Sequence, residues 1–116
     1  MKKENHSEIK DIRAQVRTAA ADGASVEFTF PDSILVYQFP LRDWSDNGLG
    51  ILIKQDARIL DYIRVGQIFS VSLRRGGRSL ALEMYQVEIR HISDPGQGQH
   101  PGHKVVGLKI LERIQM

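Results

Sequence analysis

The amino-acid sequence predicts an all-β fold, a six-stranded antiparallel closed barrel preceded by an N-terminal helix or flexible arm. From about residue 25 onward, apolar residues recur mostly at every second position, the period of a half-buried strand. Clusters of glycine, proline, asparagine and aspartate separate these runs, as they do between short antiparallel strands. Closing such strands into a barrel removes the exposed edges that a small open sheet would have.

Residues 1–24 are predicted to form an arm that is helical over residues 5–21. Asn5 stands at the capping position, and Glu8 follows three residues later, as in a capping box. Apolar residues then recur at helical spacing, namely Ile9, Ile12, Val16 and Ala20. Gly23 ends the helix, since glycine is a common helix terminator. Residues 25–116 then form the barrel, which is the one globular domain expected.

Six strands are expected, over residues 26–30, 34–43, 49–54, 67–75, 78–92 and 104–111. Pro40 should place an edge, a bulge or a bend in the second strand, because proline lacks a backbone N–H. Gly76 and Gly77 suit a two-residue primed turn between the fourth and fifth strands. The other connections are a helical turn or crossing loop over 55–66, a flexible loop over 93–103, and a frayed tail or helical turn over 112–116.

The composition indicates one globular domain and excludes cysteine chemistry and a membrane-spanning helix. The 116 residues and the hydrophobic content of 41% suffice for one domain with a buried core. Without cysteine there is no disulfide, thiolate nucleophile or cysteine-based zinc site. No apolar run reaches the roughly 18 residues that a membrane span needs, and the first residues do not resemble a secretory signal. We therefore expect no membrane insertion and a cytoplasmic location.

The charged residues favour a small anionic ligand over DNA. The net charge of +2 is too low to predict broad binding to nucleic acid. Ten of the 16 basic residues are arginine. The guanidinium group matches phosphate bidentately and also stacks on bases, so arginine suits a ligand that carries both.

The main candidate site is the segment 43–50, Asp-Trp-Ser-Asp-Asn-Gly-Leu-Gly, between the second and third expected strands. A carboxylate accepts hydrogen bonds, a hydroxyl donates or accepts them, and glycine lets a ligand approach the backbone closely. Arg13 and Arg17, four residues apart, would project from one face of the expected helix. Together these residues predict a site for an anionic molecule that carries bases.

These features resemble the signature of the PilZ domain family, bacterial receptors for the second messenger cyclic di-GMP. The family pattern has two arginines spaced R-x-x-x-R and, further along, D/N-x-S-x-x-G before a strand. Arg13 and Arg17 match the first part of the pattern. Asp43, Ser45 and Gly48 match the second part, with 25 residues between the two parts. The resemblance implies the same six-stranded barrel that the strand pattern predicts.

The resemblance also implies a function as a receptor without a cofactor, whose ligand is cyclic di-GMP. The ligand would bind between the arginine segment and the 43–50 loop, with Arg13 and Arg17 on its phosphates or guanines. Asp43 would accept hydrogen bonds from a guanine, and Ser45 would donate one to a phosphate or to a guanine carbonyl. Gly48 is expected to adopt a positive φ in the turn after Asn47, with or without a ligand. The signal would pass to an unidentified downstream protein or through a homodimer.

Other interpretations stay open at this stage. The arginines lie on an expected helix, whereas the family places them on an extended segment, and solvated charges on a helix face would explain them equally well. Asp43 and Ser45 suit a turn even without a ligand. Trp44, where the family usually has a smaller aliphatic residue, is expected in the core or at its rim.

The alternative function is a PilZ-like adaptor that binds proteins and no nucleotide. An RNA-binding barrel is a third hypothesis, but the basic stripe with interleaved aromatic residues is missing.

The remaining polar residues do not predict a metal site or a catalytic site. Arg42 and Arg90 are additional candidates for ligand contact. His91, His100 and His103 lack the spacing of a zinc site, so no metal is expected. No Ser-His-Asp arrangement or catalytic pair of acids is evident, and the chain is therefore expected not to be an enzyme.

Overall fold

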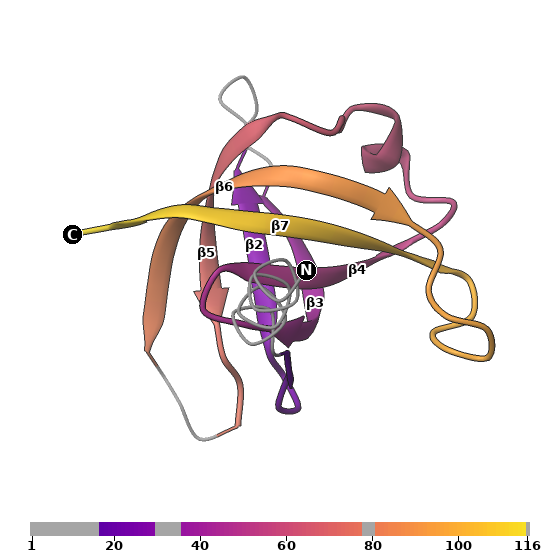
Figure 1. The fold of residues 1–116 in the computed structure, drawn as a ribbon, viewed down its shortest axis with the longest axis horizontal. Coiled ribbons are helices and arrows are strands. Elements are labelled where there is room, and N and C mark those ends of the chain that lie inside the picture. Colours follow the sequence, from indigo (N-terminus) through magenta and orange to yellow (C-terminus); the bar gives the residue numbers. More distant parts are fainter. Residues whose placement is uncertain (1–16, 30–35, 78–80, 116) are drawn as a thin grey trace, which may run out of the picture.

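β-Strands make up most of the chain that the computed structural model describes, residues 17–29, 36–77 and 81–115 (Figure 1). The strands are β1 (Thr18–Ala19), β2 (Ser25–Thr29), β3 (Val36–Trp44), β4 (Gly48–Lys54), β5 (Ile68–Arg74), β6 (Leu82–Ser93) and β7 (His103–Ile114). The 3₁₀ helix η1 (Arg58–Asp61) lies between β4 and β5, so the helical-turn alternative holds for this connection. The described residues contain no α-helix, and the all-β prediction is confirmed.

Six of the strands close into an antiparallel barrel. Their hydrogen-bonded order is β3-β2-β5-β6-β7-β4, and a further pairing between β3 and β4 closes the ring. The short strand β1 is added outside this ring and pairs with the end of β3, with Thr18 opposite Trp44 and Ala19 opposite Asp43. In Figure 1 the long strands β6 and β7 run side by side across the molecule, and β2 and β5 cross them at a steep angle. The predicted six-stranded closed barrel is therefore confirmed.

The barrel is filled by side chains from alternate positions of its strands. On β4, Leu49, Ile51 and Ile53 point into the core and are at most 1% exposed. Aromatic residues fill one region of the core, where the ring of Phe28 packs against those of Phe39 and Phe69 at centroid distances of 5.6 and 5.4 Å. Residues on the other face of each strand point outward because side chains alternate along a strand.

The predicted helix is wrong at the end that the structure describes. Thr18 and Ala19 form strand β1, and Ala20 donates its backbone N–H to the carbonyl oxygen of Arg42 at 3.0 Å. The backbone groups of this segment therefore bond to β3 and not to a helical turn of their own. Residues 5–16 of the predicted helix lie outside the described residues. The helical spacing of apolar residues did not identify this extended pairing, because β1 is only two residues long.

Pro40 lies where β3 changes partners. It stands opposite Ser25 of β2, and the next residue, Leu41, stands opposite Ile51 of β4. The register with β4 shifts between Leu41 and Asp43, which is a bulge or irregularity of the kind that proline was expected to cause. On both sides of this shift the last residues of β3 pair with β4, where the candidate site lies.

Two connections differ from the prediction. Arg74 pairs with Leu82, so the link between β5 and β6 is longer than the two-residue turn expected at Gly76 and Gly77. Both glycines do adopt positive φ, and Gly77 donates its N–H to the carbonyl oxygen of Asp22 at 2.9 Å. The predicted tail over 112–116 is also wrong as far as residue 114, because β7 continues to that point in register with β6.

Within the described ranges, no helix has the length and apolar character needed to cross a membrane.

Candidate ligand-binding site

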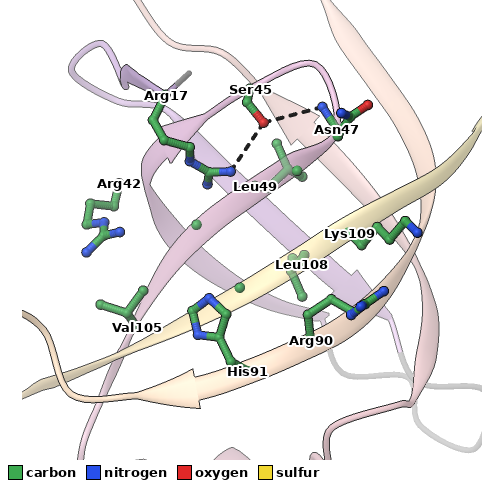
Figure 2. A pocket seen from close by; sticks show the side chains of 13 residues that line it. Arg17, Arg42, Ser45, Asn47, Leu49, Arg90, His91, Val105, Leu108 and Lys109 are labelled. Carbon is green, nitrogen blue, oxygen red and sulfur yellow. Dashed lines mark hydrogen bonds between the residues drawn. The ribbon is translucent and has the colours of Figure 1, made fainter. Parts of the chain in front are cut away.

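A pocket of about 670 Å³ lies on the outer surface of the barrel, over the paired strands β4 and β7 (Figure 2). Leu49 and Leu108 stand opposite each other in these strands and belong to the core, so their neighbours Gly48, Gly50 and Gly107 face outward. Gly50 pairs with Gly107. The absence of side chains at this pair leaves space that neighbouring side chains enter, the Asp43 carboxylate over Gly50 and the His91 imidazole over Gly107.

Arg17 and the 43–48 segment meet at one edge of this pocket. The Arg17 guanidinium donates from NH2 to Oδ1 of Asp43 at 2.7 Å and from NH1 to Oγ of Ser45 at 3.2 Å. Figure 2 shows the second of these bonds, with the Arg17 side chain extended toward Ser45. Arg17 immediately precedes β1, and the pairing of Ala19 with Asp43 fixes the distance that its side chain has to span. The short strand β1 thus positions the arginine.

Asp43 does not itself line the pocket but pairs with arginines that do. Its carboxylate, only 15% exposed, also accepts a hydrogen bond from Nε of Arg42 at 3.0 Å. Both of its oxygens are therefore engaged by guanidinium groups, one by Arg17 and the other by Arg42. Hydrogen bonds between ionised partners are roughly twice as strong as neutral ones. Asp43 therefore holds two arginines at the pocket, and its predicted contact with a guanine stays a prediction.

The turn from Ser45 to Gly48 is closed by its own hydrogen bonds. Ser45 donates its backbone N–H to the carbonyl oxygen of Gly48 at 2.9 Å, and its Oγ accepts from the N–H of Asn47 at 3.3 Å. Asn47 in turn accepts from the N–H of Ile110 at 2.8 Å, which ties the turn to β7. Ser45 is buried, so its hydroxyl is fixed between the turn and Arg17.

The prediction of a positive φ at Gly48 is wrong, because none of the positive φ values among the described glycines falls there. A different constraint explains a glycine at this position. A Cβ on Gly48 would lie 2.9 Å from the carbonyl oxygen of Leu108 and 3.2 Å from NH1 of Arg17. At Gly50, a Cβ would overlap Oδ1 of Asp43 and lie 3.3 Å from NH2 of Arg17. The two glycines thus give the Arg17–Asp43 pair the space it occupies.

Of the predicted site residues, Arg17, Asp43, Ser45 and Gly48 are brought together. Arg13 lies outside the described residues. Trp44 packs against the core, as expected, and its outer face is covered by the guanidinium of Arg75, which lies 4.4 Å from the ring centroid.

Several lining residues were not among the main site residues predicted from the sequence. Arg42 and Arg90, named only as additional candidates, both line the pocket. His91, Gly107 and Lys109 line it too. Side chains two residues apart on a strand share a face, as Gly107 and Lys109 of β7 do, but only the register between β4 and β7 shows that this face adjoins Gly48 and Gly50.

The pocket lining is strongly cationic. Its described residues include the side chains of Arg17, Arg42, Arg90 and Lys109 and no carboxylate. The chain as a whole has a net charge of only +2, so positive charge is concentrated at this place. The described residues hold no group of three or more histidines, cysteines or acids that could bind a metal. The arrangement suits a polyvalent anion.

The sequence matches no family model and no curated protein. The structure, however, is similar to three solved structures. The PilZ domain of YcgR from Escherichia coli with c-di-GMP superposes with a TM-score of 0.64 at 16% identity, over 84% of this chain and 76% of that one. The chain has a PilZ-like fold.

The other two similar structures are longer proteins. The inhibitor of motility MotI/DgrA from Bacillus subtilis gives a TM-score of 0.65 at 13% identity, over 85% of this chain and 42% of that one. The PlzA protein of Borreliella burgdorferi in complex with c-di-GMP gives 0.61 at 11% identity, over 95% of this chain and 50% of that one. The PilZ-like chain therefore spans half or less of each of these two proteins.

Proposed function

We propose that this domain is a receptor that binds cyclic di-GMP in the pocket between Arg17 and the outer face of β4 and β7. The observation that carries the proposal is the meeting of Arg17, Asp43 and Ser45 at the edge of that pocket. These residues match the R-x-x-x-R and D-x-S-x-x-G parts of the PilZ signature. Two of the structures with a similar fold contain c-di-GMP, which supports the same ligand here.

The charges of the pocket suit the two phosphates of this ligand. Four cationic side chains line the pocket, and its volume of about 670 Å³ falls within the usual range for small-molecule sites. Arginine can bind a phosphate through two parallel hydrogen bonds or stack on a guanine. Arg17 and Arg42 are each about one-third exposed, so a ligand can reach them without a rearrangement of the barrel.

Ligand binding would change the hydrogen-bond partners of Asp43. In the structure its carboxylate accepts hydrogen bonds from both Arg17 and Arg42. A phosphate that binds either guanidinium replaces one of these interactions with another of the same kind. The oxygen that becomes free on Asp43 can then accept from the ring N–H or amino group of a guanine. Charge on the arginines is thus compensated both before and after binding.

The same proposal covers the biological role. The domain acts by binding, in the bacterial cytoplasm, and passes the signal to a downstream protein or to a second copy of itself. A change of partners at Arg17, from Asp43 and Ser45 to the ligand, would be the switch, because its cause is local and electrostatic.

Isothermal titration calorimetry of the purified chain with cyclic di-GMP tests the proposal. We expect saturable binding to the wild type, and strongly weakened binding to Arg17→Ala and Asp43→Ala. GTP, which also carries guanine and phosphates, serves as the control for nonspecific attraction to the cationic pocket. Wild-type protein that is folded and gives no binding, by calorimetry and by equilibrium dialysis, would contradict the proposal. The adaptor without a nucleotide would then be the better explanation.

A further inference from the structure

His91 stands on the side of the pocket opposite Arg17. Figure 2 shows His91 and Arg90 on this side, with Arg17 and Ser45 across the pocket. In the sheet, His91 of β6 pairs with Gly107 of β7, and Gly107 pairs with Gly50 of β4. One row of neighbouring residues therefore leads from Asp43 through two glycines to His91.

A register shift brings two consecutive residues of β6 to the pocket. Ile89 is opposite Leu108 and His91 is opposite Gly107, so Arg90 is an extra residue on β6. Such a bulge re-aims the side chains next to it. Arg90 and His91 are both exposed and both line the pocket, whereas side chains of successive residues in a regular strand point to opposite faces.

The imidazole lies directly over Gly107. A Cβ at Gly107 would overlap the ring atoms Nε2, Cδ2 and Cε1. The ring therefore occupies the space above the glycine backbone, with one side against the sheet. Its Nδ1 lies 3.3 Å from Oγ of Ser93, an interaction that holds the ring in this orientation. Because His91 is exposed, its outer side is accessible from the pocket.

We propose that His91 is a base-stacking residue of this pocket, and that it receives one guanine of the bound dinucleotide while Arg17 and Arg42 hold the other end. The inference rests on the proposed function and adds a residue outside the two signature motifs. Histidine is one of the side chains on which unstacked bases stack, and such contacts tolerate different bases because each has a π-face. The neighbouring cations Arg90 and Lys109 would lie beside a phosphate, which the charge of the ligand requires.

The two sides of the row approach each other over the glycines. Asp43 on β3 and His91 on β6 are three strands apart, but the Asp43 carboxylate lies over Gly50 and the imidazole lies over Gly107. Because Gly50 and Gly107 are paired, the ligand would bind on top of these side chains, between the guanidinium of Arg17 and the ring of His91.

Titration of His91 variants with cyclic di-GMP tests the inference. We expect His91→Ala to bind roughly tenfold more weakly than the wild type, and His91→Phe to stay within about threefold of it, since the phenyl ring keeps the stacking surface. His100→Ala, in the exposed loop between β6 and β7, is the matched control and should bind like the wild type. Gly107→Ala should displace the imidazole and weaken binding in the same direction as His91→Ala.

A spectroscopic measurement distinguishes stacking from a structural role. In NMR spectra of the wild type, the His91 ring protons should shift upfield on addition of ligand, because a stacked base shields them. Wild-type binding that is abolished by Arg17→Ala and unchanged by His91→Ala would overturn this inference and leave the proposed function intact. Absence of binding to the wild type would overturn the proposed function and this inference with it.

Discussion

Arg17 and Asp43, 26 positions apart in the sequence, form an ion pair of 2.7 Å at the edge of the cationic pocket. The pair depends on strand pairing, since Ala19 lies opposite Asp43 and Arg17 is two residues before it. Glycines at positions 48 and 50 leave room for the two side chains. The pairing of β1 with β3 therefore brings together the arginine part and the Asp43 part of the sequence signature.

Arg17→Ala should weaken binding of cyclic di-GMP at least tenfold, because a hydrogen-bonded contact between charged groups contributes about 1.5–3 kcal/mol. Arg64→Ala is the control, since Arg64 is also exposed and does not line the pocket. Calorimetric affinities measured at one salt concentration check the result. Equal loss in both variants would mean that net charge, and not the position of Arg17, determines binding.

Asp43→Asn should lower the free energy of unfolding by about 1–2 kcal/mol, because it leaves the guanidinium groups of Arg17 and Arg42 without their shared carboxylate. Urea denaturation at neutral pH measures the change. Asp46→Asn removes an exposed acid from the same turn and should leave stability nearly unchanged. A similar effect of both substitutions would show that the ion pairs of Asp43 contribute nothing specific.

Gly50→Ala should reduce ligand affinity about tenfold or more, because the new Cβ would overlap Oδ1 of Asp43 and displace the carboxylate together with Arg17. Gly96→Ala is the matched control. Its Cβ would meet only the end of the Gln99 side chain, which can move aside. Circular dichroism would establish that both variants are folded before their affinities are compared. Wild-type affinity in folded Gly50→Ala would contradict the assigned geometry.

The stability of the domain in acid should depend on the hydrogen bonds that Glu83 accepts from Arg75 and Tyr85. The Arg75 guanidinium donates to both carboxylate oxygens of Glu83, at 2.7 and 3.2 Å, and Tyr85 donates its hydroxyl at 2.6 Å. The hydrogen bonds from Arg75 are the main reason that the pKa of Glu83 lies below its ordinary value of 4.5. A lowered pKa in the folded state means that this stabilisation is complete above the ordinary value and is lost as the pH falls through the folded-state pKa.

Glu83→Gln should therefore reduce the free energy of unfolding by about 1–3 kcal/mol at neutral pH, and its difference from the wild type should shrink as the pH falls below the ordinary glutamate pKa of 4.5. Urea unfolding at several pH values measures this. The exposed Glu112→Gln is the control and should show little difference at any pH. A Glu83→Gln deficit that stays constant into acid would indicate that the shape of the side chain matters and its charge does not.

Much of the fold could be predicted from the sequence because burial imposes a period of two on barrel strands. Leu49, Ile51 and Ile53 show this pattern, and all three are in the core. The spacing of apolar residues near the N-terminus did not predict strand β1. Strand β1 has two exposed residues, Thr18 and Ala19, and its pairing with β3 is set by the tertiary structure alone.

The candidate site could be predicted in part for a similar reason. Asp43, Ser45 and Gly48 are close in sequence, and a motif can identify such a group. His91 and Lys109 reach the pocket only through the registers of β6, β7 and β4. A shift of one residue in either register would turn these side chains to other faces, and the sequence pattern alone does not determine that register.

A crystal structure of the chain with cyclic di-GMP tests the central claim most directly. We expect ligand density over Gly50 and Gly107, with the Arg17 guanidinium moved from Oδ1 of Asp43 onto a phosphate or guanine. Density elsewhere on the barrel, with the 2.7 Å pair of Arg17 and Asp43 unchanged, would contradict the account.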